Sequence, residues 1–293
     1  MSANSLKWKR RYKKSELKKQ YQDDSGRGDL TDEQWEKLRS LLPPQKAWTG
    51  QPAADHRRVV NGILWLHRTG APWRDIPAER YGNHRTISSR FYRWRKAGIW
   101  QQIWSSLMQQ ADAVGRIDWE VHFEGWNNCP RSPSRCGRKG GEAETQALGR
   151  SVGGFSTKVH VKAEGFGKPI NFVVTSGERH EAVAFPDLVK GGSVKRQGRG
   201  RPKYRSRYLV GDKAYSSQKI RQQLRRSGTT PVIPKRSNEK RQGRFNRGLF
   251  RERNRIERLI NRLKQYRRIA TRYEKYAVNY LAMLMIGAIR LWL

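Results

Sequence analysis

Cysteine is nearly absent from this sequence, which contains 2 in 293 residues. Two cysteines cannot form a disulfide framework, so we expect a protein of the reducing cytoplasm. Long apolar runs are missing too, because no stretch approaches the ~20 residues of a membrane span and the N-terminus has no apolar signal region. These absences exclude a disulfide-rich secreted domain and predict no membrane partner.

Acidic residues are also scarce, with 25 Asp and Glu against 62 Lys and Arg, and the formal charge is +37. A field this positive attracts polyanions, and nucleic acid gains affinity as Lys and Arg release counterions from its phosphates. Disorder is the rival explanation for so much charge. The 11 Trp, 11 Tyr and 8 Phe argue against it and predict a folded protein.

The chain is long enough for two domains at ~150 residues each. Residues 1–28 are polar and basic, and we interpret them as a flexible arm or as a reading frame that starts too early. Residues 29–112 carry a helical pattern, and from about residue 117 the apolar period changes from that of helices to that of strands. We therefore expect a helical domain over 29–112 and a mixed domain over 117–293.

The helical pattern begins at LTDEQWEKLRSLLPP, where Thr31 can cap a helix and Gln34 can complete a capping box. Pro43 and Pro44 should end that helix. A second helix is predicted in HRRVVNGILWLHRTG, with Gly70 as its C-terminal cap.

A third helix is predicted in RTISSRFYRWRKAG, where Ile87, Phe91 and Trp94 share one face. Its remaining surface carries four candidate DNA-binding residues: Arg85, Arg90, Arg93 and Arg95. A short helix, a turn and a basic amphipathic helix are typical of a helix-turn-helix-like DNA reader. A solvated basic face on a small helical bundle is the alternative.

Alternating residues in GFSTKVHVKAEG predict a half-buried strand, with Val159 and Val161 inward and His160 and Lys162 outward. PINFVVTSG should follow as a strand, and a helix is expected around 180–189. The apolar strand YLVG then ends at Asp212, and the chain closes with TTPVIPK and two helices, RERNRIERLINRLKQYRRI and KYAVNYLAMLMIGAIRLWL. Strands followed by late helices indicate an α/β domain.

Two carboxylates are candidates for chemistry. Asp212 lies where a buried strand meets a loop, although an ordinary turn Asp is common there. Arg253, Glu257 and Lys264 form one stripe of a late helix, opposite an apolar stripe of Ile256, Leu259, Ile260 and Leu263. A surface Arg–Glu pair is the ordinary explanation of such a stripe.

The spacing Phe250-x2-Arg253-x3-Glu257-x6-Lys264 resembles the Y-x2-R-x3-E-x6-K signature of bacterial DDE transposases, with Phe in place of Tyr. Five further segments look like transposases of the insertion-sequence-five family: LTDEQWEKLRSLLPP, GAPWRDIP, GRSVGGFSTKVH, GDKAYSS and RNRIERLINRLKQYRRIATRYEK. Together they cover about residues 28–293, and several motifs in the right order make the resemblance specific.

This resemblance implies an RNase H-like catalytic core behind a helical, helix-turn-helix-like N-terminal domain. The family cuts and joins DNA at the ends of its own mobile element, so the implied partners are terminal repeats and target DNA, bound by a homodimer in the bacterial cytoplasm at the nucleoid. Two Asp and one Glu hold two divalent ions, Mg²⁺ or Mn²⁺, through hard oxygen ligands. By motif, Asp212 corresponds to the second Asp and Glu257 to the Glu, while Arg253 and Lys264 would contact phosphate.

The first Asp is missing. In the family it opens a segment like DGTxVRAH after a strand, whereas this chain has GWNNCPRSPSRC at 125–136. Among synonymous codons for that string, one set that is shifted by one base encodes DGTTVRAHQAGA, which predicts a local frameshift with intact flanks. Asp118 lies before the strand, and Glu124 should point to the other side by strand alternation. The resemblance then implies a transposase by descent whose catalysis is severely impaired.

Other residues carry weaker signals. His122, His160 and His180 show no metal-ligand spacing, and a lone C-x6-C made by Cys129 and Cys136 is weak for zinc. The resemblance gives His180 and Glu181 a supporting role beside the site. The run KRQGRGRPKYRSR is a minor-groove arm or a solvated loop. Two other functions stay open: a non-enzymatic DNA-binding remnant that occupies or represses element ends, and a basic RNA-binding protein, which leaves the Arg–Glu–Lys stripe unexplained.

Overall fold

The computed structural model describes residues 28–45, 54–132, 146–151, 154–196, 198–237 and 245–293. The helical part contains α2 (Asp32–Arg39), α3 (His56–Thr69), the 3-10 turn η2 (Trp73–Asp75), α4 (Ala78–Tyr81), α5 (His84–Lys96) and α6 (Ile99–Ala113). Its predicted caps are confirmed. Thr31 and Gln34 form the capping box of α2, and Gly70 ends α3 with a φ of 74°. The first helix ends at Arg39, ahead of the two prolines.

The predicted basic amphipathic helix is α5. Ile87, Phe91 and Trp94 are buried on its inner face, as expected. Asn83 caps its N-terminus by accepting a hydrogen bond from the backbone N–H of Arg85. Arg85 and Arg93 are exposed and Arg90 and Arg95 are half-buried, so the basic side chains lie over the rest of the helix surface.

The second part is built on one sheet of β1 (Val121–Pro130), β2 (Gly149–Ser151), β3 (Gly154–Ala163), β4 (Pro169–Ser176), β5 (Tyr208–Val210) and β6 (Thr230–Val232). Its order is β4-β3-β1-β5-β6, with β2 also paired to β3. The pairs β1–β3 and β3–β4 are antiparallel, whereas the pairs β1–β5 and β5–β6 are parallel. These directions give the RNase H-like arrangement, and the predicted fold class is confirmed.

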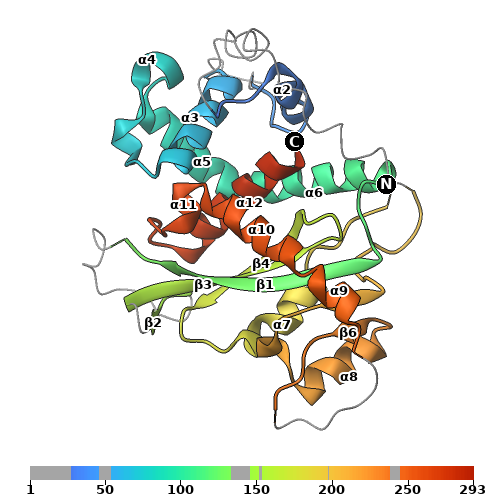
Figure 1. Cartoon of the computed structure of the whole chain (residues 1–293). Coiled ribbons are helices and arrows are strands. Elements are labelled where there is room, and N and C mark those ends of the chain that lie inside the picture. The colour runs from blue at the N-terminus through green and yellow to red at the C-terminus, as the bar shows by residue number, and fades with distance from the viewer. Residues whose placement is uncertain (1–27, 46–53, 133–145, 152–153, 197, 238–244) are drawn as a thin grey trace, which may run out of the picture.

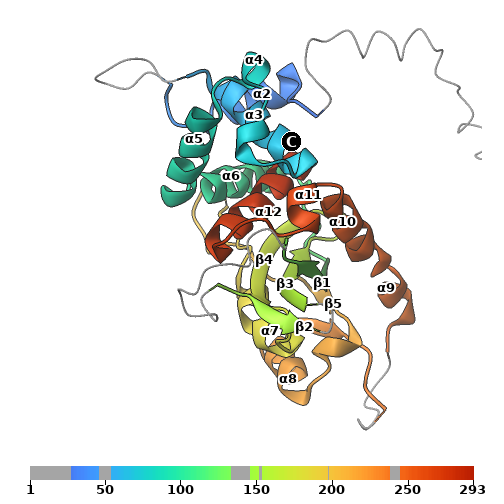
Figure 2. The ribbon, with the colours of Figure 1, turned by 90° about the vertical axis from the view of Figure 1, so that its left-hand side faces the viewer.

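Helices cover both faces of the sheet (Figures 1 and 2). One face carries α10 (Asn254–Lys264), α11 (Arg267–Ala270) and α12 (Ala277–Trp292). The other carries α7 (Glu181–Lys190), the 3-10 turn η4 (Lys213–Tyr215) and α8 (Gln218–Arg226), while α9 (Arg247–Arg251) precedes α10. The first of the two predicted C-terminal helices is therefore three pieces, α9 to α11, whereas the second is α12.

The prediction of a half-buried β3 is wrong, because the strand is buried on both faces. Lys158, His160 and Lys162 are 5%, 0% and 1% exposed. Each polar side chain has partners that permit its burial. The Nζ of Lys158 lies 2.7 Å from Glu181, His160 lies within hydrogen-bonding distance of Tyr215 and Thr175, and the Nζ of Lys162 donates to backbone carbonyls.

β1 continues through residues 125–130, the first half of the segment GWNNCPRSPSRC. The sequence predicted that the strand ends before Gly125, yet β1 reaches Pro130 and pairs with β3 up to Ser156. Burial raises the pKa of the Cys129 thiol to about 11, which makes it an unreactive core residue. Residues 133–136, including Cys136, lie outside the described residues. Within the described part, no three His, Cys, Asp or Glu side chains form a metal site.

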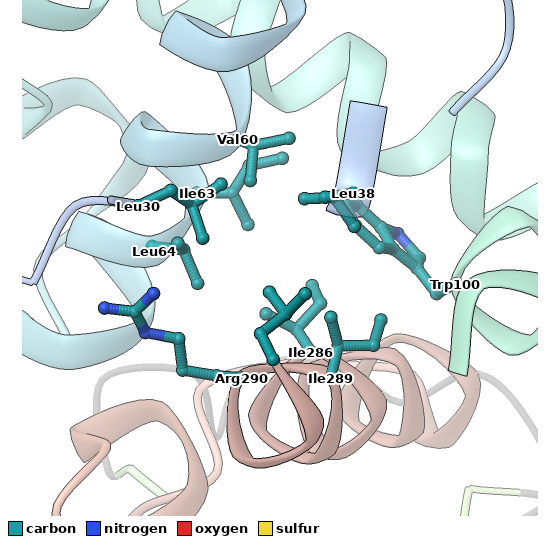
Figure 3. Close-up of a pocket in the computed structure, with 10 residues that line it drawn as sticks. Leu30, Leu38, Val60, Ile63, Leu64, Trp100, Ile286, Ile289 and Arg290 are labelled. Carbon is teal, nitrogen blue, oxygen red and sulfur yellow. The ribbon is translucent and has the colours of Figure 1, made fainter. Parts of the chain in front are cut away.

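The N-terminal helices and the C-terminal helix share one apolar core. Figure 3 shows side chains of α3 and α12 facing each other across a small apolar gap of about 10 Å³, with Leu38 and Trp100 beside them. Arg290 of α12 donates to the backbone oxygen of Asp29 at 3.1 Å and to the side chain of Gln34. The division at residues 112–117 stays a prediction, and across the described ranges no helix has the length and apolarity that a membrane crossing requires.

Candidate active site beside the parallel strands

Asp212 lies just beyond the carboxyl end of β5, at the start of η4. Its Oδ1 accepts a hydrogen bond of 2.6 Å from the backbone N–H of Lys213, which fixes the carboxylate at the strand end. The side chain remains 38% exposed. Carboxyl ends of parallel strands are the usual place for ligand sites in α/β sheets.

Glu257 lies in the first turn of α10, where a carboxylate is favoured by the helix dipole. The helix forms because Ile256, Leu259, Ile260 and Leu263 make an apolar stripe, and all four are buried against the sheet side, as predicted. Glu257 lies on the other side of the helix and is 48% exposed.

Arg253 joins the two carboxylates. Its Nη2 lies 3.0 Å from Oε1 of Glu257, and its Nη1 lies 3.9 Å from Oδ2 of Asp212. The guanidinium also lies 5.9 Å from the ring centroid of Phe250, the residue that replaces Tyr in the family signature. Asp212 and Glu257, which are 45 positions apart in sequence, thus meet at one point through a single cation.

Lys264 is not part of this cluster. It follows Glu257 by seven residues, which is about 10 Å along the helix axis. Its side chain is exposed and lies beside Asn127 of β1. It extends the cationic stripe of α10 instead of joining the carboxylates.

Gly125 occupies the position where a third carboxylate would belong. Phe123 and Val210 are the last paired residues of the parallel strands β1 and β5, and two residues further on come Gly125 and Asp212. A Cβ atom added at Gly125 would lie 2.9 Å from Cγ1 of Ile256, so this position faces the helix that carries Glu257. The contact is closer than real Cβ atoms show, so the buried, β-branched Ile256 has to move before a substituent fits at this position.

Glu124 and Asp118 do not replace the missing group. Glu124 is fully buried beside Lys162, away from α10, and burial raises its pKa to about 8. Neither of its carboxyl oxygens has a hydrogen-bond partner among the described residues. Asp118 precedes β1 and accepts a hydrogen bond of 2.8 Å from the backbone N–H of Glu120.

The residues present do not fit a pair of divalent ions. Two partly exposed carboxylates share one guanidinium, which already neutralises part of their charge. Each Mg²⁺ is usually held by one or two carboxylates together with water and phosphate oxygens, and the described residues bring no third acid that two ions would share. No step through a metal follows from the chain as written.

The predicted helpers His180 and Glu181 lie at the start of α7, which packs against η4, the turn that Asp212 caps. His180 caps α7, and its Nε2 lies 3.2 Å from Nη2 of Arg236. Glu181 is occupied by the nearly buried Lys158, whose Nζ also lies 4.8 Å from the ring centroid of Trp126. The alternation of β3 marked Lys158 as a surface residue, so sequence reasoning missed this ion pair.

Comparisons with known proteins agree with this architecture. The family described as Transposase DDE domain matches residues 122–292, and a family of transposases of the IS4/5 group matches residues 30–104. The chain is 35% identical over 83 residues to the uncharacterized protein y4sN of Sinorhizobium fredii, covering 28% of this chain and 66% of that protein. It is 30% identical over 131 residues to a Burkholderia cepacia protein named as a transposase for insertion sequence element IS402, covering 45% and 60%.

The matches thus span slightly less than two thirds of both relatives. A crystal structure of a pre-cleavage Mos1 transpososome aligns over 77% of this chain and 81% of that one at 9% identity, with a TM-score of 0.26, on which no argument rests. The match to the DDE domain covers more than half of the chain. The chain belongs to the DDE transposases of the IS4/5 family.

Proposed function

We propose that this chain binds the ends of an insertion sequence as double-stranded DNA, and that the glycine at position 125 severely impairs the strand cleavage and transfer for which its fold is built. The observation that carries the proposal is the alignment of Gly125 with Asp212 beside the helix of Glu257. One of three acids is absent at the point where the other two meet.

The basic helix α5 supports DNA binding. Arg85 and Arg93 are exposed and Arg90 and Arg95 half-exposed around its buried apolar face, and the chain as a whole carries +37 formal charges. Phosphate contacts supply most sequence-independent affinity for DNA and do not need the acidic site. Binding to terminal repeats should therefore survive the loss of one carboxylate.

The altered segment still has the side-chain alternation of a strand that faces α10 to α12. Gly125 approaches Ile256, Asn127 lies beside Ile260, and Cys129 is buried beside Ile269. In DGTTVRAHQAGA the same three positions would carry Asp, Thr and Val. An acid would face the helix of Glu257 and a valine would enter the core, which is the pattern of a selected strand.

The test compares metal-dependent cleavage of the element's own end by three chains: the chain as written, Gly125→Asp, and a chain with DGTTVRAHQAGA at 125–136. We expect cutting in Mg²⁺ or Mn²⁺ only with the acid restored. Asp212→Ala and Glu257→Ala in the repaired chain should abolish it. Equal cutting by the chain as written would refute the proposal.

A second candidate function is a non-enzymatic binder that occupies element ends and represses active copies. The contact of Arg253 with both remaining acids favours it, because their charge is partly neutralised without a metal. Protection of the terminal repeats without nicking would support it.

The joining of two element ends requires at least a dimer, so light scattering of the DNA complex should show two chains.

A further inference from the structure

A pocket of about 320 Å³ lies where η2 and α5 meet the segment that joins α11 to α12. This volume is within the usual range of small-ligand sites, ~300–1,000 Å³. Four aromatic residues line it: Trp73, Tyr92, Tyr273 and Tyr276. Two of them stay at the surface, because Tyr92 is 39% and Tyr276 47% exposed. The pocket shares no lining residue with the carboxylate site.

Its charged side chains are mainly cationic. Arg95, Arg268 and Lys275 line the pocket, and Glu274 is its one acidic lining residue. Glu274 is already engaged, since its Oε1 lies 2.6 Å from Nη1 of Arg268 in a buried ion pair. The pocket thus combines aromatic surface with an excess of positive charge. Arg95 also belongs to the basic set of α5.

Three buried polar atoms of this pocket have no hydrogen-bond partner in the described part of the chain: Nε of Arg95, Nε of Arg268 and Oδ1 of Asn279. Arg268 is 3% and Asn279 7% exposed. Native proteins leave few such groups unpaired, because an orphaned buried donor or acceptor costs stability. The side chains that carry these atoms line the pocket, so its wall offers arginine donors and an amide to a ligand that enters it.

Flat surfaces are held in place within the pocket. The guanidinium of Arg268 lies 5.6 Å from the ring centroid of Trp73 and 5.3 Å from that of Tyr273. Its Nη2 donates to the backbone oxygen of Ala71 at 2.6 Å, which fixes the group from a third side. Aromatic rings and guanidinium planes are the surfaces on which unstacked nucleobases pack.

We propose that this pocket binds a nucleobase unstacked from the DNA that α5 holds. The inference rests on the proposed DNA binding and adds a site to it. A base offers a flat face to the aromatic residues and both donors and acceptors to the polar side chains of the pocket wall, while its flanking phosphates meet the cations. Bases inside an intact duplex are stacked on both faces and paired along their Watson–Crick edges, so the ligand is single-stranded or locally unpaired DNA.

The test is fluorescence anisotropy with the full chain and two labelled strands of equal length, oligodeoxythymidine and a strand whose sugars carry no bases. We expect oligodeoxythymidine to bind roughly tenfold more tightly, the scale of one base stacked on an aromatic side chain. Tyr276→Ala should remove most of this preference, and Tyr92→Ala should do the same. Both residues are exposed, so neither change removes a core side chain. Phe166→Ala is the matched control, because Phe166 is 64% exposed and lies outside the pocket.

Each other outcome overturns a distinct statement. Equal affinity of the unchanged chain for both strands refutes the base pocket and leaves DNA binding intact. Loss of the preference in Phe166→Ala as well refutes its location. Competition by thymidine monophosphate as strong as that of the strand shows a free-nucleotide site instead. Failure to bind either strand or duplex element ends refutes the proposed function itself.

Discussion

Replacing the buried Glu124 by Gln should change how the stability of the fold depends on pH. Glu124 is 0% exposed, and both of its oxygens lack hydrogen-bond partners in the described part of the chain. Burial raises its pKa from 4.5 to about 8, against the opposing effect of the neighbouring Lys162. Between these values the folded protein keeps a proton that the unfolded chain has lost. Stability therefore falls as pH rises through this window.

The contribution of Glu124 to the free energy of unfolding is clearest between pH 6.5 and 8. Burial lowers the pKa of His67 to about 3 and that of His160 to about 4, and it places that of His122 well below 6.5. These histidines act in the opposite sense, but only below pH 6.5, where the unfolded chain gains protons that the fold excludes. One carboxyl group changes stability by ~1.4 kcal/mol per pH unit, so Glu124 should cost about 2 kcal/mol from pH 6.5 to 8.

Lys162 determines how the free energy of unfolding changes above pH 8. Burial lowers its pKa from 10.5 to about 8, so above pH 8 the unfolded chain holds a proton that the fold has lost. Its contribution rises again above that point, and the two groups together predict a minimum of stability near pH 8. Urea unfolding of the unchanged chain and of Glu124→Gln at several pH values measures the difference. Curves that stay parallel from pH 6.5 to 8 would refute a neutral, buried Glu124.

Three further changes have definite expected outcomes. Arg272→Met should lower the free energy of unfolding by about 3–5 kcal/mol. The guanidinium of Arg272 is 1% exposed and donates to several backbone oxygens, including those of Gln146 and Glu274. An unchanged thermal midpoint would contradict this prediction. Ile286→Ala should cost about 2–5 kcal/mol by enlarging the gap between α3 and α12, whereas Ile286→Val should cost less, as urea titration can measure. Arg93→Ala should weaken duplex binding and reduce the salt slope by roughly one, while exposed Arg226→Ala on α8 should not; equal slopes would remove α5 from the interface.

Much of the fold could be predicted because its signals are local. Capping at Thr31, the left-handed Gly70 and the apolar face of α5 are decided within a few residues, and the structure confirms them. The burial of β3 is decided by what covers the sheet. The sequence pattern predicts that Lys162 is a surface residue. In the structure its ammonium group donates to the carbonyls of Val189 and Tyr204, which belong to distant segments of the chain.

Part of the candidate site could also be predicted from local signals, and part of it depends on the tertiary fold. The stripe of Arg253 and Glu257 follows from helix geometry, and its neighbourhood to Asp212 follows from the family resemblance. That Arg253 contacts both acids depends on where β5 ends relative to α10, which no spacing within the sequence encodes. The aromatic pocket is similarly non-local, because Trp73 and Tyr276 lie 203 positions apart and neither carries a motif.

The pairing of β1 with β3 shows that this fold does not depend on an acid at position 125. β1 pairs with β3 from Phe123 to Pro130 through backbone groups, which are the same for any non-proline side chain. The side chains of this stretch need only be small or apolar where they meet α10 and α11, and Gly125 and Cys129 meet that demand. A carboxylate at position 125 would contribute nothing to the ladder and would place a third negative charge beside Asp212 and Glu257. Selection for folding therefore would not favour an acid there, so only selection for strand cutting would keep one.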